Sequence, residues 1–460
     1  MIDMNYCKKK IKMHMDLETR SFIHFFLACK RRFKSMNQER LKKYQLRKAQ
    51  NIVNHTYSQS PFFNKLYSKS DLNDVWNLPM VNKSVMMDNL TDYNTEGLIK
   101  EQLVDFCLRI ESTHNYEERF GKYNVAMSSG TSGNKGIVIT SPAEEKYLRA
   151  AFFARFSFPK TLKLNIAFIL RVTTPAFQID SFGQKLTHIS QLNPIENILK
   201  SLQELQPNVL AGPPSMLRLI SKEINEGRLD INPPRVVSFA EILYPEVEKE
   251  LEEIYGCKIH QIYQASEGPI AMSCKHGSLH INEDIINVQT FNSDGTVTHP
   301  GEACYKMIVT DLHRRTQPII RYELNDLITI SPKNCECGSS FRVIEQIQGR
   351  NDDLLWSHRK DTGKLQFIFP DYLRRAVISS SEEIVEYQVI QKSFTSLEVR
   401  LKLRSEESPK EEIIGIVENK LKQVFESYSC EMPKIKTCFE KEEIHPISNK
   451  LVRIQRNFEI

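Results

Sequence analysis

A loop rich in glycine and hydroxyl residues, Ser128-Ser129-Gly130-Thr131-Ser132-Gly133-Asn134-Lys135-Gly136, most constrains what this chain can fold into. Segments expected to form strands, Tyr123–Met127 and Ile137–Thr140, stand before and after it. Its glycines allow positive φ and close approach to an anion. Successive backbone N–H groups, the hydroxyls and Lys135 suit a polyphosphate. The Walker pattern is absent. A flexible linker is the alternative, and the flanking strands count against it.

After this loop, apolar segments of strand type and helix type alternate along the chain. The expected strands cover 208–211, 235–239 and 258–263, and the expected helices cover 215–226 and 245–255. Such alternation predicts an α/β layered fold with mixed sheets and helices. Strands and turns follow over 285–345, and the residues after Gly349 have a β-α-β pattern with a charged helix near 409–427.

The length of 460 residues exceeds that of one ordinary domain. We expect a basic helical extension over 1–58, a large domain over 59–349 and a small C-terminal α+β domain over 350–460, with one long helix within 16–58. Residues 1–50 carry 14 Lys and Arg against four Asp and Glu, in a chain of net charge +5. A solvated amphipathic helix accounts for this excess, and contact with nucleic acid or an anionic membrane is the alternative.

No stretch reaches the roughly 18 apolar residues that span a bilayer. The ten cysteines are scattered, and no export signal precedes them. We therefore expect the chain to work in the reducing cytoplasm.

Two further motifs follow expected strands. Tyr263-Gln264-Ala265-Ser266-Glu267-Gly268 ends a strand, where open α/β sheets bind their ligands. Its ring, hydroxyl and carboxylate could stack a base, contact a phosphate and hold Mg²⁺. Asp326, in Arg321-Tyr322-Glu323-Leu324-Asn325-Asp326, could accept both hydroxyls of a ribose. Taken singly, Glu267 and Asp326 are better explained as turn residues.

The order of these motifs, followed by Gly349-Arg350-Asn351-Asp352-Asp353, resembles the adenylate-forming superfamily of acyl-CoA synthetases and related ligases. Within it the chain is most similar to the phenylacetate-CoA ligase-like group, which includes capsule-biosynthesis homologues and synthetases that adenylylate a deazaflavin coenzyme. The resemblance covers roughly residues 55–460 and implies an AMP-forming ligase of the acid-thiol type.

The resemblance also implies roles for individual residues. The β- and γ-phosphates of ATP would be held by Ser128, Ser129, Gly130, Thr131, Ser132, Gly133, Lys135 and Gly136. Tyr263 would lie against the adenine, Ser266 near the α-phosphate, and Glu267 on Mg²⁺. Asp326 would hold the ribose beside Arg350.

The remaining roles implied by the resemblance depart in part from the family pattern. Asp352 would be the hinge of the C-terminal domain. In the adenine-lining segment Ser238-Phe239-Ala240-Glu241, which would include Ala240 and Glu241 as contacts, the family often has more glycine. Lys450 would contact the carboxylate and the α-phosphate, and Asn449 before it replaces the usual glycine. Asparagine tolerates a left-handed turn, so Lys450, Glu267 and Lys135 stay the expected catalytic residues.

A second cluster suggests a metal. Cys335 and Cys337 form a C-x-C pair, and Cys274 and His280 lie about 60 residues upstream. Together they would make a Cys₃His zinc site, with His280 preferred over His276 because it ends an apolar stretch. The alternative is four unlinked residues.

These residues and the resemblance predict ATP-dependent activation of a small carboxylic acid as an acyl-adenylate. Pyrophosphate would leave, and the acyl group would pass to CoA or to a carrier-protein thiol. The alternative is an adenylyltransferase that leaves an AMP adduct on a small molecule or coenzyme. A non-catalytic homologue is disfavoured because Lys135, Glu267, Asp326 and Lys450 are all intact. A homodimer is compatible with the resemblance, and no nucleic-acid partner is expected.

Overall fold

The structure is a computed structural model. It describes residues 17–113, 115–127, 136–156, 159, 163–170, 180–181, 184–191, 193–350, 353–443 and 451–458. Several residues singled out from the sequence lie outside this described part: Ser128, Ser129, Gly130, Thr131, Ser132, Gly133, Lys135, Asp352 and Lys450.

The N-terminal region forms two helices where one long helix was expected. α2 spans Leu17–Ser35 and α3 spans Gln38–Gln59. The first ends at Ser35, and Asn37 caps the start of the second, because its side-chain oxygen accepts a 2.9 Å hydrogen bond from the backbone N–H of Arg40. α3 buries Ala49, Ile52 and Val53 in the main core, so this segment packs into the body of the protein.

Short helices complete this side of the molecule, namely α4 (Pro61–Leu66), α5 (Lys83–Asp88), α6 (Leu90–Tyr93) and α7 (Lys100–Thr113). They share the main core with the hairpin of β1 (Asn124–Met127) and β2 (Ile137–Thr140) and with a three-stranded antiparallel sheet. That sheet consists of β11 (Ile286–Phe291), β12 (Lys306–Asp311) and β13 (Tyr322–Leu324).

A ten-stranded sheet runs through the described part of the large body, in the order β14-β15-β10-β9-β8-β7-β6-β3-β5-β4. β5, β3, β6, β7 and β8 are parallel, and the others pair antiparallel. Their bounds are β3 Leu164–Leu170, β4 Asp180–Ser181, β5 Gln184–Ser190, β6 Val209–Gly212, β7 Val236–Phe239, β8 Ile259–Ala265, β9 Gly268–Ser273, β10 Leu279–Ile281, β14 Asp326–Ile330 and β15 Val343–Arg350.

Helices cover the parallel half of this sheet. α9 (Ile195–Leu205), α10 (Pro214–Asn225) and α11 (Pro245–Tyr255) pack on it through a common apolar core that includes Leu202, Leu217 and Leu251. The other face of the same strands carries a second apolar cluster around Phe168 and Phe239. α8 (Pro142–Arg155) follows β2 and packs against α2.

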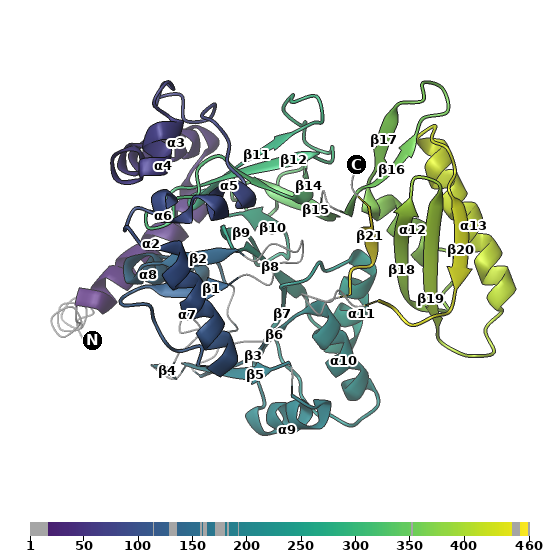
Figure 1. The fold of residues 1–460 in the computed structure, drawn as a ribbon. Helices are drawn as coiled ribbons and strands as arrows, with labels where there is room; N and C mark the ends of the chain where they lie inside the picture. Colours follow the sequence, from purple (N-terminus) through teal and green to yellow (C-terminus); the bar gives the residue numbers. More distant parts are fainter. Residues whose placement is uncertain are drawn as a thin grey trace.

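The residues after Arg350 form a C-terminal unit with a core of its own, built around Val389, Val399 and Leu421. Its sheet has the order β20-β19-β18-β21. In Figure 1 it stands at the right, beside α10 and α11 of the large body. Its elements are β16 (Leu355–His358), β17 (Leu365–Ile368), α12 (Pro370–Ile378), β18 (Ile384–Ser393), β19 (Ser396–Leu403), α13 (Lys410–Ser427), β20 (Lys434–Cys438) and β21 (Ile454–Arg456).

The mixed α/β architecture confirms the fold class expected from the sequence. The strands expected around the glycine-rich loop and the helix expected at 245–255 are present, as β1, β2 and α11. Within the described part of the chain, every helix falls short of the length and apolar character that crossing a bilayer requires.

Candidate nucleotide site

Three of the residues singled out from the sequence meet in the large sheet, two at the ends of the adjacent strands β14 and β15 and one on β8. Asp326 begins β14 and lies opposite Arg350, which ends β15. Its Oδ1 is 3.5 Å from Nε of Arg350, and its Oδ2 accepts a 2.6 Å hydrogen bond from the hydroxyl of Tyr263 on β8. Burial, and to a lesser extent the charge of Asp326, raises the pKa of Tyr263 well above its usual value. The phenol therefore stays protonated and remains a donor.

Glu267 follows β8 in the same region. Burial raises the pKa of this carboxyl, against the lowering effects of the neighbouring Tyr322 hydroxyl and Arg314. The ammonium of Lys83, at the start of α5, interacts electrostatically with both Glu267 and Arg350. Lys83 was missed at the sequence level, because nothing near it in the chain suggests that α5 would pack beside this site.

In the segment expected to line the adenine, Phe239 makes an aromatic contact and Glu241 makes polar contacts. Phe239 stacks on Phe168, with ring centroids 4.8 Å apart and an interplanar angle of 10°. Ala240 takes a positive φ of 66°, a conformation that favours glycine and is strained for other residues. Glu241 binds the start of α10, where Ser215 donates from its backbone N–H at 3.2 Å and from its hydroxyl at 3.0 Å. Its carboxylate thus already has partners within the fold.

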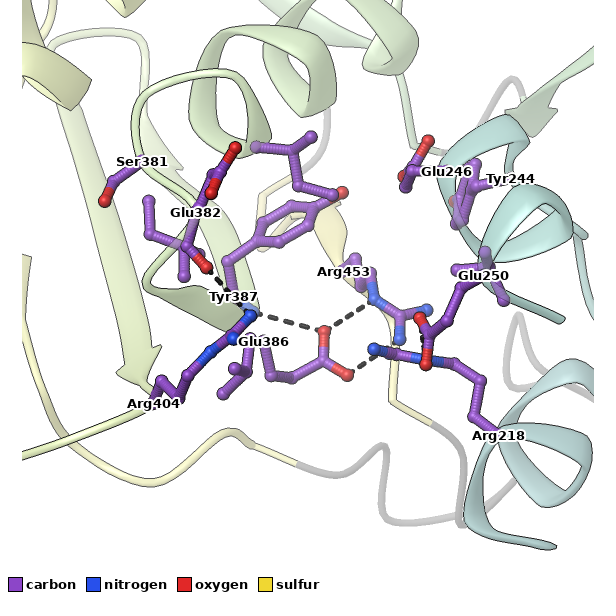
Figure 2. Close-up of a pocket in the computed structure, with 14 residues that line it drawn as sticks. Arg218, Tyr244, Glu246, Glu250, Ser381, Glu382, Glu386, Tyr387, Arg404 and Arg453 are labelled. Carbon is purple, nitrogen blue, oxygen red and sulfur yellow. Dashed lines mark hydrogen bonds and ion pairs between the residues drawn. The ribbon is translucent and has the colours of Figure 1, made fainter. Parts of the chain in front are cut away.

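The large body meets the C-terminal unit through charged and aromatic side chains around a cavity of about 220 Å³. Figure 2 shows Arg218 and Glu250 on the helices of the body facing Glu386 and Arg453 of the C-terminal unit. Arg453 makes two 2.7 Å bonds to the carboxylate of Glu386.

A second ion pair crosses the same boundary. The buried guanidinium of Arg374, on α12, binds both carboxylate oxygens of Glu246, on α11, at 2.7 Å. It also lies over the ring of Tyr244, 4.7 Å from the centroid, and Arg453 lies 5.9 Å from that ring. Two guanidinium groups of the C-terminal unit thus lie close to the ring of Tyr244, and these contacts favour the present arrangement of the two parts.

The structure brings together the four residues expected to bind a metal. The ligand atoms of Cys274, His280, Cys335 and Cys337 all lie within 4.8 Å of one another. Sγ of Cys274 is 3.7 Å from Sγ of Cys335, and Sγ of Cys337 is 3.3 Å from Nε2 of His280. These separations fit the edges of a tetrahedron with zinc–ligand bonds of about 2.0–2.3 Å. His276 is exposed and lies outside the group.

The surroundings of the four residues also suit a metal. Nδ1 of His280 is 2.8 Å from the backbone oxygen of Phe341, which leaves Nε2 to face the sulfurs. Backbone N–H groups of His276, Cys337 and Ser339 point at the sulfurs of Cys274, Cys335 and Cys337, each at 3.4 Å. Such donors stabilise thiolates, the form in which cysteine binds zinc.

Comparison with known proteins agrees with this architecture. No model of a protein family matches the chain. The chain is 25% identical over 230 residues to protein CapK of Staphylococcus aureus, which covers 49% of this chain and 48% of CapK. It is 22% identical over 380 residues to phenylacetate-coenzyme A ligase of Thermus thermophilus, covering 77% and 79% of the two chains. The chain thus spans about half the length of the first relative and more than three quarters of the second.

Solved structures of 2-hydroxyisobutyryl-CoA ligase are similar over most of the chain. With that ligase in the postadenylation state the TM-score is 0.70, at 16% identity, over 93% of this chain and 91% of the other. For its open conformation the TM-score is 0.60 over 89% and 90%, and for its thioesterification state it is 0.55 over 93% and 91%, both at 16% identity. The chain is therefore similar in sequence to phenylacetate-coenzyme A ligase, and its fold is similar to that of 2-hydroxyisobutyryl-CoA ligase.

Proposed function

We propose that the chain is an AMP-forming ligase that activates a carboxylic acid with ATP and passes the acyl group to a thiol. The observation that carries this proposal is the meeting of Tyr263, Asp326 and Arg350 beside Glu267, in the strand-end position where the family binds its nucleotide. The sequence relationship to phenylacetate-coenzyme A ligase supports the same activity.

The geometry suits the nucleoside part of ATP. The carboxylate of Asp326 is oriented by Tyr263 on one oxygen and by Arg350 on the other. Each oxygen keeps a free lone-pair direction that can accept one hydroxyl of a ribose. The Tyr263 ring would lie against the adenine, with Ala240 and Glu241 nearby. Since Glu241 is already bound to Ser215, its backbone is the better candidate for contact with the base.

The phosphates would lie toward the β1–β2 hairpin. Ser128 to Gly133, Lys135 and Gly136 would hold the β- and γ-phosphates, and Ser266 would approach the α-phosphate. Glu267 would hold Mg²⁺, whose charge supports the reaction at the α-phosphate. Lys135 and Lys450 would neutralise the charge that develops there.

The adenylation step needs no protein base. An oxygen of the substrate carboxylate, already ionised near neutral pH, attacks the α-phosphorus. As that O–P bond forms, the bond from the α-phosphorus to the bridging oxygen of pyrophosphate breaks. In the second half-reaction the thiol of CoA or of a carrier protein loses its proton to solvent and its sulfur attacks the acyl carbon, and the bond from that carbon to the phosphate oxygen of AMP breaks. Positioning of the two anions therefore does most of the catalytic work.

Two half-reactions require two arrangements of the C-terminal unit. We propose that residues 350–460 form a mobile domain that turns about Asp352, since the unit has its own core. The present arrangement would serve adenylation, because the TM-score is higher for the postadenylation state of 2-hydroxyisobutyryl-CoA ligase than for its thioesterification state. Residues 1–58 would be an extension whose second helix is built into the large body.

We further propose that Cys274, His280, Cys335 and Cys337 hold a structural zinc ion, since the four ligands close the coordination shell and leave no open position for substrate. The other described cysteines are free thiols, in keeping with the proposed reducing cytoplasm.

The decisive experiment is pyrophosphate exchange into ATP with a panel of aryl, fatty and amino acids, followed by addition of CoA. An acid that supports exchange, and a thioester product with CoA, would establish the proposed ligase. Exchange without any thioester would instead favour an adenylyltransferase that stops at the AMP adduct. Lys450→Ala is expected to abolish exchange while leaving the melting temperature unchanged. No exchange with any acid by the wild-type protein would refute the proposal.

A further inference from the structure

The β1–β2 hairpin carries the glycine-rich loop, yet among the described residues neither strand pairs with any third strand. The edge of β2 that faces away from β1 presents the backbone groups of Ile137 and Ile139. An unpaired strand edge buried in the protein would be costly, since each buried N–H and C=O requires a partner. Something other than a strand must therefore satisfy this edge.

Side chains bind all four backbone groups of this edge, namely the N–H and the C=O of both Ile137 and Ile139. The buried side-chain amide of Gln317 copies a neighbouring strand, because its Oε1 accepts from N–H of Ile139 at 3.0 Å and its Nε2 donates to the oxygen of Ile137 at 2.8 Å. Nη2 of Arg314 donates to the oxygen of Ile139 at 3.2 Å. The N–H of Ile137 points to the sulfur of Met87 at 3.3 Å.

Arg314 extends this network to the second nucleotide motif. Its Nη2 also donates to Oε1 of Gln317 at 2.7 Å, and its Nη1 donates to the backbone oxygen of Ser266 at 3.0 Å. Asp311 fixes the arginine itself, because its Oδ1 accepts from the backbone N–H of Arg314 at 2.8 Å. One guanidinium thus joins the strand that leaves the glycine-rich loop to the residue before Glu267.

We propose that Gln317 and Arg314 are positioning residues that set the distance between the phosphate-binding loop and the Ser266–Glu267 motif. This inference rests on the proposed function. Ile137 directly follows Gly136, the last residue of the loop, so a shift of β2 moves the root of the loop. Both side chains are buried, Gln317 to 1% and Arg314 to 6% exposure, and act on backbone atoms.

A specific consequence follows for the ligands. The loop would hold the β- and γ-phosphates, which ATP has and AMP lacks. Loss of the Gln317 amide should therefore weaken the use of ATP and pyrophosphate while sparing AMP and the acyl-adenylate. A general loss of folding would weaken all of them together, and this difference separates a positioning role from a structural one.

The test uses the full chain with Gln317→Leu, which keeps the bulk of the side chain and removes the donor and the acceptor. We expect KM for ATP in pyrophosphate exchange to rise about tenfold, from the loss of two buried backbone contacts. KM for preformed acyl-adenylate in transfer to the thiol should change less than about twofold, since that half-reaction does not need the loop.

The matched control is Gln391→Leu. Gln391 is fully buried and makes the same reciprocal pair with a strand, accepting from N–H of Trp356 at 3.0 Å and donating to its oxygen at 2.6 Å, but in the C-terminal unit. Gln391→Leu should lower the melting temperature about as much as Gln317→Leu does. It should leave the ratio of KM for ATP to KM for acyl-adenylate unchanged. Where Gln317→Leu does not fold, Arg314→Lys removes the planar fork and keeps the charge, and the same ratio should rise.

Equal weakening of ATP and acyl-adenylate, or no change in either, would overturn the proposed positioning role. Failure of the proposed function is a separate outcome. In that case the wild-type protein itself would show no pyrophosphate exchange with any acid, before any variant is compared.

Discussion

The hydroxyl of Tyr263 donates a 2.6 Å hydrogen bond to Oδ2 of Asp326, across 63 positions of sequence. Charge-assisted bonds of this length are among the stronger ones in proteins. The bond fixes the carboxylate on the side away from Arg350, so its remaining lone pairs face a defined direction. The pair links the end of β8 to the start of β14 and so ties together two motifs that are separate in the sequence.

The first prediction concerns this bond. Tyr263→Phe removes the hydroxyl and leaves the ring, so contact with adenine should persist while Asp326 loses its orientation. We expect KM for ATP to rise about five- to tenfold, equivalent to about 1.0–1.4 kcal/mol, with a smaller effect on kcat. Tyr255→Phe is the control, because it also removes a buried hydroxyl, bonded to the oxygen of Leu217 at 3.0 Å. An equal rise in KM in the control would contradict the assignment.

The second prediction concerns pH. Burial raises the pKa of Glu267 above the ordinary value of 4.5, and only the ionised carboxylate binds Mg²⁺. The acidic limb of kcat/KM should therefore lie above pH 4.5. Protons and Mg²⁺ compete for the same carboxylate, so raising the Mg²⁺ concentration should move that limb to lower pH. Glu267→Gln should lose most activity at every pH. An acidic limb that does not respond to Mg²⁺ would point to another group.

The third prediction concerns the boundary with the C-terminal unit. Glu246→Gln weakens the pair with Arg374 and loosens the hold on Tyr244. If the present arrangement serves adenylation, pyrophosphate exchange should slow about two- to tenfold while thioester formation from supplied acyl-adenylate is kept or accelerated. Asp361→Asn is the control, because it breaks the Arg359–Asp361 pair within the same unit. Slowing of both half-reactions by the same factor would argue against a conformational role.

Strand and helix patterns predicted much of this architecture, because alternation and turn residues are local signals. β2 at Ile137–Thr140 and α11 at Pro245–Tyr255 have the bounds expected from the sequence. The expected single helix over 16–58 was wrong, because the capping signal of Asn37 was overlooked. The four metal-type residues could be grouped because cysteine and histidine are rare enough for their pairing to be noticed.

Other parts of the site had no local signal. Gln317 binds β2 across 178 and 180 positions, and an isolated glutamine in the sequence says nothing of a strand edge that it will satisfy. Glu241 matched a family position, but its contact with Ser215 depends on how α10 begins beside β7. Side chains that bind distant backbone groups leave no periodic pattern, and they become visible only once the sheets are assembled.

The fourth prediction concerns the metal centre. The purified protein should contain about one zinc ion per chain, the stoichiometry of one closed Cys₃His site. Cys335→Ser should remove it and lower the melting temperature, and Cys257→Ser, which changes a cysteine outside the cluster, should do neither. The ring of Phe33 on α2 packs on His280 at 5.3 Å, so loss of zinc should also speed proteolysis at α2. A folded, metal-free wild-type protein would exclude the site.

The last prediction concerns acid and the N-terminal helices. His313 lies between Tyr44 of α3, at 3.1 Å, and Tyr147 of α8, at 2.9 Å. Burial lowers the pKa of His313 to about 3 from 6.5. His313 is therefore neutral in the folded protein. When the N-terminal helices separate from it, the exposed imidazole binds a proton at a higher pH. The folded state therefore keeps its full stability above pH 6.5 and loses it progressively as the pH falls toward 3. The loss amounts to about 2 kcal/mol at pH 5.

The charged groups around His313 are Asp284, whose backbone oxygen it contacts, together with Arg32 and Lys48. Asp311, with a pKa raised to about 6, acts in the opposite direction, because its folded form binds a proton more tightly than its unfolded form. His313→Gln removes only the histidine contribution. The free energy of opening of α2 and α3, obtained from hydrogen exchange after correction for the intrinsic rate at each pH, should fall between pH 7 and pH 5 in the wild-type protein and much less in the variant. An equal fall in both would contradict the assignment to His313, because the pKa of Asp284 is lowered below 3.8 and its ion pairs with Arg32 and Arg155 keep their charge between pH 7 and pH 5.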